Sequence, residues 1–201
     1  MNAMFSRRTL LAATAVSALA LTACERKTRV TYNGIDLAGA AYATDFQLTD
    51  TQGKERRLAD FRGKAVLVFF GFTQCPDVCP TALARAAEVK RLLGADGDRF
   101  QTLFITIDPE RDTPEMLQAY TAAFDESFIG LYGDLPRTQQ TAKDFKVFYK
   151  KVPTGSSYTM DHSSLSYVYD PQGKLRLALR HEQSPQEYAD DLRKLLHSTP
   201  T

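Results

Sequence analysis

The sequence lacks a strong charge of either sign, an internal repeat, and a hydrophobic run long enough to cross a membrane comfortably. Its 25 basic and 24 acidic residues give a formal net charge of +1. The basic residues are scattered, so nucleic acid and acidic lipid surfaces are not expected as partners. Because no window of the sequence repeats, a solenoid is not expected. The 201 residues, 43% of them hydrophobic, suit one globular domain.

The most apolar segment lies at the N-terminus, where Arg7 and Arg8 precede a short stretch of small apolar residues. This pattern is typical of an export signal. The stretch ends in LTAC, whose last residue is Cys24, and it resembles the lipobox of bacterial lipoproteins. We therefore expect a signal peptide of the lipoprotein type over residues 1–23, lipid on Cys24, and a tether over residues 24–43. A plain signal peptide or an uncleaved anchor is the alternative, and the general and twin-arginine export routes both stay open.

Segments typical of strands and of helices alternate from residue 44 to residue 198. Residues 64–72 and 100–108 are continuous apolar runs, as expected of strands buried on both faces of a sheet. The other expected elements are a short hairpin over 45–56, helices over 80–94, 113–124, 136–149 and 184–198, a strand over 128–133 and a hairpin over 165–180. Thr113 and Ser184, each followed by proline, are the expected caps of two helices. This order predicts an α/β domain of the thioredoxin-like kind, with a central mixed sheet flanked by helices and an extra N-terminal hairpin.

Two of the three cysteines follow the first buried strand, in the stretch GFTQCPDVCP. Functional groups of α/β sheets gather at the carboxyl ends of strands, and Cys75 and Cys79 would share one face of a helical turn. The free amides and dipole of a helix start favour thiolates there. A structural disulfide would stabilise little in so small a loop, and thioredoxin-type redox exchange uses two intervening residues where this chain has three. A structural disulfide, a redox pair and a metal site all stay open at this point.

A metal site needs further ligands, and the chain offers three histidines. His181 and His197 are expected to be solvated surface residues. His162 lies in a polar loop before the last hairpin and is the natural third donor. Two thiolates and one imidazole suit three-coordinate Cu(I), whereas Zn(II) usually takes a fourth ligand. The neighbouring Asp161 either orients the imidazole or caps a turn.

The segments GFTQCPDVCP, IDPERDTPEML and YTMDHS together resemble the Sco (synthesis of cytochrome c oxidase)/SenC copper-chaperone family, over about residues 45–196. The resemblance implies a thioredoxin-like fold and copper held by Cys75, Cys79 and His162, as Cu(I), with Cu(II) also open. It implies a role in assembly of the dinuclear copper centre (Cu-A) in subunit II of cytochrome c oxidase, by metal delivery, thiol reduction or both. The lipoprotein-like N-terminus is a departure, since many members use a transmembrane helix instead.

The resemblance also implies partners, and the lipobox-like stretch that ends at Cys24 implies a location. The partners would be subunit II or another envelope cuproprotein, and an upstream copper donor or thiol reductant. A lipid anchor would hold the protein at a membrane of the bacterial cell envelope, with the domain facing the periplasm.

Several charged residues near these motifs are candidates to support the site or to dock a partner. They are Asp77, between the cysteines, Asp108, Arg111 and Asp112 in the stretch DPERDTP, and Asp161. Because DPERDTP follows a strand, its side chains would border the copper loop or a docking surface. Helix capping alone is the alternative explanation.

The sequence leaves open whether the protein is an enzyme. In a thiol–disulfide oxidoreductase of the envelope, Cys75 would attack and Cys79 would resolve. Thioredoxin-type reductases place a proline just before the hairpin strand that faces the thiols, and this chain has Ser164 and Leu165 there. This difference argues against broad disulfide exchange. A copper-responsive or antioxidant module is a third class, for which the sequence has no dedicated peroxide-binding motif.

Overall fold

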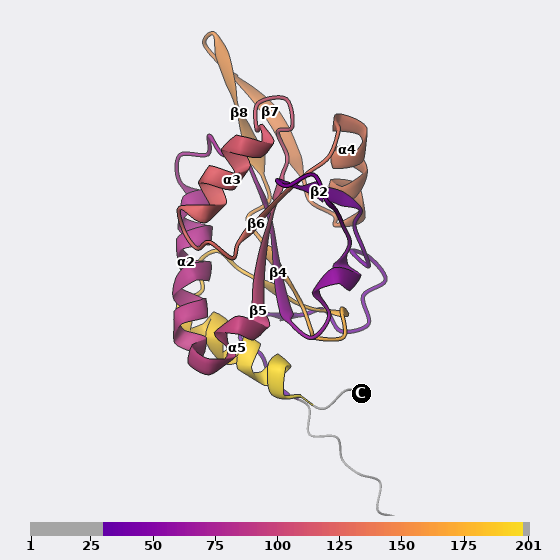
Figure 1. Cartoon of the computed structure of the whole chain (residues 1–201), viewed down its shortest axis with the longest axis vertical. Coiled ribbons are helices and arrows are strands. Elements are labelled where there is room, and N and C mark those ends of the chain that lie inside the picture. Colours follow the sequence, from indigo (N-terminus) through magenta and orange to yellow (C-terminus); the bar gives the residue numbers. More distant parts are fainter. Residues whose placement is uncertain (1–29, 199–201) are drawn as a thin grey trace, which may run out of the picture. The chain divides into compact units, whose positions relative to one another are not determined.

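An eight-stranded mixed sheet forms the centre of the domain that begins at Tyr32 (Figure 1). The computed structural model describes residues 30–198. The strand order is β1-β10-β9-β4-β5-β6-β2-β3, with β4–β5 and β5–β6 parallel and the other neighbours antiparallel. The strands are β1 (Ile35–Asp36), β2 (Leu48–Asp50), β3 (Glu55–Arg56), β4 (Ala65–Gly71), β5 (Phe100–Thr106), β6 (Ile129–Tyr132), β9 (Ser166–Tyr169) and β10 (Leu175–Leu179). The expected mixed sheet and N-terminal hairpin, β2–β3, are confirmed.

The two central strands, β4 and β5, explain where a site can form. Every residue of both strands is buried, as their continuous apolar sequences require. They pair in parallel from Ala65 with Phe100 to Gly71 with Thr106. Their carboxyl ends therefore lie side by side, and the Ile107 N–H donates a hydrogen bond to the Gly71 carbonyl (2.8 Å). The loops that follow the two strands meet at one edge of the sheet.

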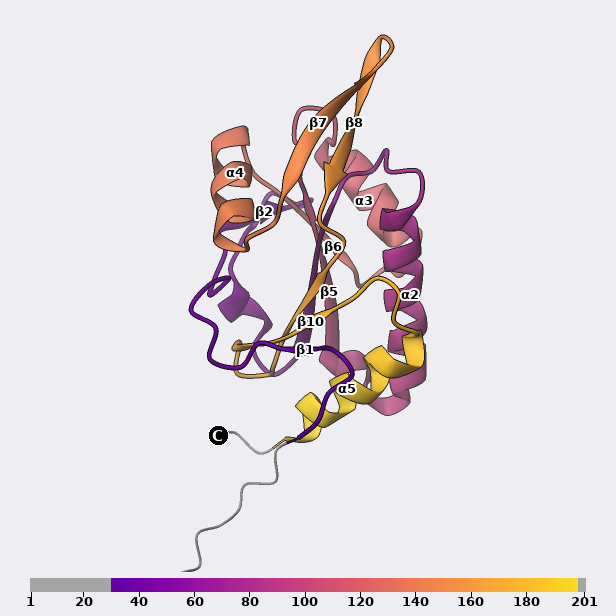
Figure 2. The same ribbon diagram turned by 180° about the vertical axis from the view of Figure 1, so that it is seen from behind.

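Helices cover both faces of this sheet. In both views α2 and α3 lie on one side and α4 on the other, while α5 packs against α2 (Figures 1 and 2). The helices are η1 (Leu58–Phe61), α2 (Val78–Leu93), η2 (Gly94–Arg99), α3 (Pro114–Ala122), α4 (Leu135–Asp144) and α5 (Pro185–His197). The predicted caps are confirmed, because the Thr113 and Ser184 side chains accept hydrogen bonds from the third backbone N–H beyond them.

Residues 33–43, expected from the sequence to lie in the tether, are part of the domain. Their strand β1 pairs with β10. The Tyr169 hydroxyl donates a hydrogen bond to the carbonyl of Ala43 (2.6 Å), which is buried. The end of the tether expected at residue 43 therefore lies too far along the chain. The segment has little apolar periodicity of its own, and its backbone is ordered by residues distant in sequence.

A second hairpin replaces the polar loop that the sequence suggested before residue 165. The helix expected to run to residue 149 ends at Asp144, and Lys146 has a left-handed backbone (φ 55°). β7 (Tyr149–Thr154) and β8 (Ser157–His162) then form an antiparallel pair of their own, which projects from one end of the domain (Figures 1 and 2). Most residues of β7 are exposed, so they lack the apolar alternation that would have marked a strand.

The predicted signal peptide, Cys24 and the first part of the tether lie outside the described residues. Within residues 30–198, no helix combines the length and the apolar content that a membrane span needs.

Candidate metal centre

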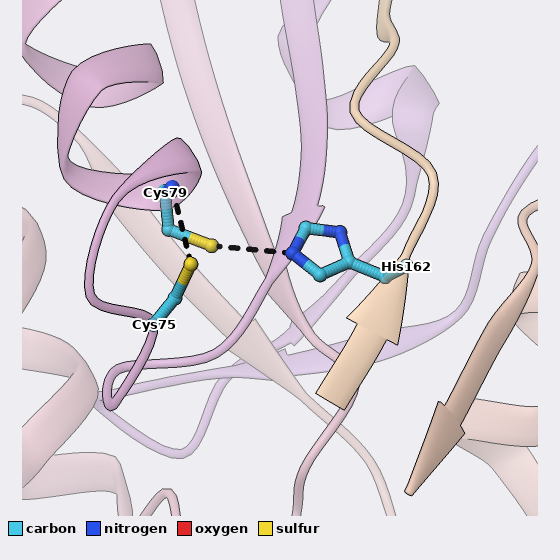
Figure 3. A group of neighbouring side chains, drawn as sticks. All are labelled: Cys75, Cys79 and His162. Carbon is cyan, nitrogen blue, oxygen red and sulfur yellow. Dashed lines mark hydrogen bonds between the residues drawn. The ribbon is translucent and has the colours of Figure 1, made fainter. Parts of the chain in front are cut away.

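The two cysteines lie where β4 gives way to α2. Cys75 is in the loop and half-buried, and Cys79 is in the first turn of the helix and fully buried (0% exposed). Both are free thiols. The Cys79 N–H, one of the amides that a helix start leaves without a helical partner, points at the Cys75 sulfur (N···Sγ 3.4 Å) (Figure 3). The two cysteines are thus not joined as a disulfide, and the backbone N–H of Cys79 is already directed at the Cys75 sulfur.

His162 reaches the thiols from the end of β8. Side chains alternate along a strand, so Tyr158, Met160 and His162 share the face of β8 that turns toward the domain. The Nε2 atom of His162 lies 3.6 Å from the Cys79 sulfur, although the two residues are 83 positions apart (Figure 3). The donor atoms of Cys75, Cys79 and His162 all lie within 4.8 Å of one another. The structure therefore brings together the three residues singled out in the sequence.

The imidazole is fixed by a backbone carbonyl and two aromatic rings. Its Nδ1 lies 2.9 Å from the Ser163 carbonyl oxygen, and since a carbonyl only accepts, Nδ1 carries the proton. Nε2 is then the free nitrogen, aimed at the thiols. Phe69 and Phe72 meet the ring edge-on, with centroids 6.1 and 5.9 Å away. Ser163 thus has the orienting role that the sequence suggested for Asp161, whose side chain is exposed.

The two thiols have opposite acid–base tendencies. A hydrogen bond from the Cys79 thiol, together with the backbone N–H groups of Asp77 and Cys79, lowers the pKa of Cys75 to about 3 in spite of burial. The pKa of Cys79 is raised, because its thiol donates to Cys75 and because it is buried next to that negative charge. At neutral pH the pair therefore offers one thiolate and one thiol. The Nε2 atom of His162 faces them.

Such a donor set suits a soft metal ion. Thiolates and imidazole together favour Cu(I), which accepts three ligands, and Zn(II) would need a fourth. Burial of Cys79 beside half-buried Cys75 and His162 gives a shallow site with one protected ligand. Within the described part of the chain this is the only group of cysteine, histidine and acidic side chains arranged to hold a metal.

The other candidate residues lie around this centre in different ways. Asp108 and Asp112 are buried after β5, and Arg111 is partly buried between Asp108 and β8. Burial raises the pKa of Asp112. Asp77 is exposed directly before α2, and its side chain makes no cap.

The two remaining histidines lie away from the thiols. His197 is largely exposed and pairs with Asp96, and His181 is half-buried next to Arg85.

Other residues that shape the centre are not predicted from the sequence. Gly71 leaves room for the Cys79 sulfur, Phe69 and Phe72 pack on the imidazole, and Thr73 ties the cysteine loop to Asp112. A glycine between a buried strand and a cysteine loop is a sequence signal for close packing of the strand end against a cysteine. Phe69 and Phe72 give no such signal, because they belong to an apolar run that is already explained by a buried core strand.

This is a domain of the thioredoxin-like class, in which two thiols after a central strand and an imidazole from a distant hairpin form a group able to hold a metal. The chain belongs to the SCO1/SenC family, whose model matches residues 36–197.

Individual relatives agree with this assignment. The SCO2-like protein of Rickettsia felis is 38% identical over 152 residues, which is 74% of each chain. The structure of Bradyrhizobium japonicum ScoI with copper bound is 42% identical with a TM-score of 0.69, covering 75% of this chain and 97% of that one. The apo Sco1 protein of Thermus thermophilus is 36% identical with a TM-score of 0.74, covering 84% and 99%. The expected family and the thioredoxin-like fold are confirmed.

Proposed function

We propose that this protein is a copper chaperone that holds Cu(I) with Cys75, Cys79 and His162 and delivers it to the Cu-A site of cytochrome c oxidase subunit II. Keeping the subunit's thiols reduced is a second part of the same role. The observation that carries the proposal is the convergence of three soft donor atoms within 4.8 Å from two distant segments. The copper-bound Bradyrhizobium relative supports the choice of metal.

The uneven burial of the ligands suits transfer by ligand exchange. Cys75 and His162 are half-exposed, so thiols of a recipient can approach the ion from their side and replace them one at a time. Cys79 is fully buried and would be the last ligand to release the ion. Oxidation of the two thiols to a disulfide removes the donors, so the redox state of the pair would control loading.

Copper titration of the reduced, metal-free protein under anaerobic conditions tests the proposal. We expect one Cu(I) per chain, and an affinity that falls at least about tenfold in Cys75→Ala, Cys79→Ala and His162→Ala. His181→Ala is the matched control and should bind as tightly as the unchanged protein, since His181 lies beside Arg85. Equal affinity in the three ligand variants would contradict the proposal.

Delivery is tested by mixing the copper-loaded protein with the metal-free soluble domain of subunit II. Copper should move to the recipient, and its Cu-A absorption should appear when oxidant is admitted. No transfer, with the copper still on the donor, would restrict the role to storage.

A thiol–disulfide reductase is the second candidate, favoured by the lowered pKa of Cys75 beside a buried, protonated Cys79. The Cys75 thiolate would attack one sulfur of a target disulfide, and the other sulfur would leave as a thiol. Cys79 would then displace the target from the mixed disulfide, so the target ends reduced and the Cys75–Cys79 pair oxidised. An upstream thiol reductant would restore the pair. Reduction of subunit II by copper-free His162→Ala at the unchanged rate would favour this candidate.

The proposed location follows from the sequence alone. The LTAC stretch ending at Cys24 supports a lipid anchor in the bacterial envelope, with the domain on the periplasmic side. There it would meet subunit II or another envelope cuproprotein and an upstream copper donor.

A further inference from the structure

The loop after β5, residues 107–113, contacts both segments that carry the three donor atoms. It follows the strand that pairs with β4, so it lies beside the cysteine loop at the same edge of the sheet. Two adjacent side chains of this loop point in different directions. Asp112 holds the cysteine loop, and Arg111 holds the hairpin that carries His162.

The contacts of Asp112 are with the start of the cysteine loop. Its carboxylate accepts hydrogen bonds from the Thr73 hydroxyl (2.6 Å) and the Thr73 N–H (3.1 Å), two residues before Cys75. It also accepts one from the Thr106 hydroxyl (2.6 Å), at the end of β5. The thiol side of the centre is thus fixed directly to the central sheet.

The contacts of Arg111 are with β8. Its Nη1 donates to the Tyr158 carbonyl (2.7 Å), and its guanidinium carbon lies 3.7 Å from the centre of the Tyr158 ring. Its Nε donates to Asp108 (2.5 Å), and the Tyr158 hydroxyl donates to the other oxygen of that carboxylate (2.8 Å). Tyr158 lies four residues before His162 on the same face of β8, so Arg111 and Asp108 fix the strand that presents the imidazole.

The hairpin needs such an attachment. β7 and β8 pair only with each other among the described strands, and an isolated two-stranded hairpin is marginally stable in water. An ion pair between Lys151 of β7 and Glu110 of the loop also joins the two, but it is about half exposed and contributes little. Met160 packs into the core, but an apolar contact does not set the hairpin's position along the sheet edge as directional hydrogen bonds do.

Burial decides between a positioning role and a docking role for these residues. The side chains of Arg111 and Asp108 are 17% and 1% exposed, so they offer a partner little surface. A buried ion pair also adds little net stability compared with apolar residues of the same volume. Stability and docking therefore do not account for the pair, whereas placement of the imidazole does.

We propose that Arg111, held by Asp108, is a positioning residue that keeps His162 within bonding distance of the two thiols. This inference rests on the copper-binding function proposed above.

Arg111 touches none of the three donor atoms. Its shortest contacts are with the carbonyl and ring of Tyr158. Its Nη1 also donates to the side chain of the exposed Gln74 (3.2 Å), in the cysteine loop, and its guanidinium carbon lies 5.9 Å from the centre of the Phe72 ring. Because the contacts with Tyr158 are the shorter ones, the effect of Arg111 on copper binding should pass through His162 and not through Gln74.

A double-mutant cycle on the full-length protein tests this dependence. Arg111→Gln should lower the Cu(I) affinity by about 10- to 100-fold, as loss of a group that orients a ligand does. In the His162→Ala background the same substitution should change the affinity by less than about twofold, because the ligand it positions is gone. If the fold-losses of affinity in Arg111→Gln and His162→Ala simply multiply in the double variant, the inference is overturned. Arg91→Gln is the matched control, since Arg91 forms the same kind of ion pair three residues from Glu88 on the exposed surface of α2 and should leave the affinity unchanged.

Two further measurements separate positioning from general destabilisation and from a charge effect. In the copper-free Arg111→Gln protein, amide hydrogen exchange should rise in β7 and β8 while the amides of β4 and β5 keep their protection. Arg111→Lys should behave like Arg111→Gln, because a lysine cannot bridge Asp108 and the Tyr158 carbonyl at once. Full copper affinity in Arg111→Lys, or unchanged exchange of the hairpin in Arg111→Gln, would overturn the inference.

The outcomes also distinguish this inference from the proposed function. If His162→Ala binds copper as tightly as the unchanged protein, the three-ligand site itself is wrong. If His162→Ala weakens binding and Arg111→Gln does not, only the positioning role of Arg111 is wrong.

Discussion

Cys75 and Cys79 share one junction between a strand and a helix, yet only Cys75 is set up as a thiolate. The difference arises because the buried Cys79 thiol donates to Cys75, which also receives hydrogen bonds from nearby backbone amides. Binding of Cu(I) to both sulfurs would displace the Cys79 proton, so copper affinity should fall as the pH is lowered. The direction follows from competition, since protons and Cu(I) bind the same sulfur and nitrogen atoms.

Alkylation of the metal-free, reduced protein tests the protonation of Cys75. Because the pKa of Cys75 is lowered to about 3, its alkylation rate should change little between about pH 8 and pH 5, whereas an ordinary thiol slows by roughly a thousandfold over that range. Cys79→Ala removes the thiol donor and should bring back a pH dependence, while Cys79→Ser keeps a hydroxyl donor and should show less of it. A rate for Cys75 that falls like that of a free thiol would contradict the assigned hydrogen bonding.

The end of β4 is built to let α2 approach closely. A Cβ atom placed on Gly71 would lie 2.6 Å from the Cys79 sulfur and 2.8 Å from the Phe104 ring, both inside contact distance. Glycine at this position therefore lets the helix start, with its buried thiol, rest against the strand. The position of the cysteine loop therefore depends on packing against neighbouring elements as well as on its own residues.

Gly71→Ala should displace the Cys79 thiol. We expect the free energy of unfolding to fall by about 1–3 kcal/mol, as overpacking does, together with weaker Cu(I) binding. Gly130→Ala is the matched control, because a Cβ there lies 3.1 Å from the Leu117 side chain, away from the thiols, and should cost stability alone. Denaturant unfolding and copper competition measure the two effects. Unchanged copper affinity in Gly71→Ala would show that the loop absorbs the extra methyl group.

At the scale of the whole domain, the N-terminal segment and the metal centre lie at opposite ends. β1 and α5 are at one end, and the β7–β8 hairpin projects at the other (Figures 1 and 2). The N-terminal segment is fixed to α5 by the Asp191 carboxylate, which is fully buried and accepts hydrogen bonds from the N–H groups of Asn33 and Gly34 (2.9 and 2.8 Å). Residues 33 and 34 therefore lie at the end of the domain opposite to the metal centre.

Asp191→Ala should loosen this attachment without changing the metal centre. Two backbone N–H groups lose their acceptor, so the free energy of unfolding should fall by about 3 kcal/mol. Asp190→Ala, next to it but partly exposed and paired with Arg193, should change it by less than about 0.5 kcal/mol. Denaturant unfolding measures both, and copper affinity should stay constant in both. Loss of copper binding in Asp191→Ala would show that the two ends of the domain are coupled.

Features that depend on neighbouring residues can be predicted from the sequence alone. The apolar runs of β4 and β5, the caps Thr113 and Ser184, and a cysteine pair at the start of a helix are all local patterns, because they follow from strand and helix periods and from the first turn of a helix. Chemistry also made His162 the candidate third donor, since soft thiolates need a further ligand.

Contacts between segments that are distant in sequence could be seen only in the tertiary structure. The hairpin β7–β8 has exposed strands and so leaves little apolar pattern, and residues 33–43 are ordered by strands far along the chain. The lowered pKa of Cys75, the use of the Ser163 carbonyl and the place of Arg111 under Tyr158 each depend on atoms brought together across the fold. The physical reason is that hydrogen bonds and burial act over a few ångströms in space, whatever the separation along the chain.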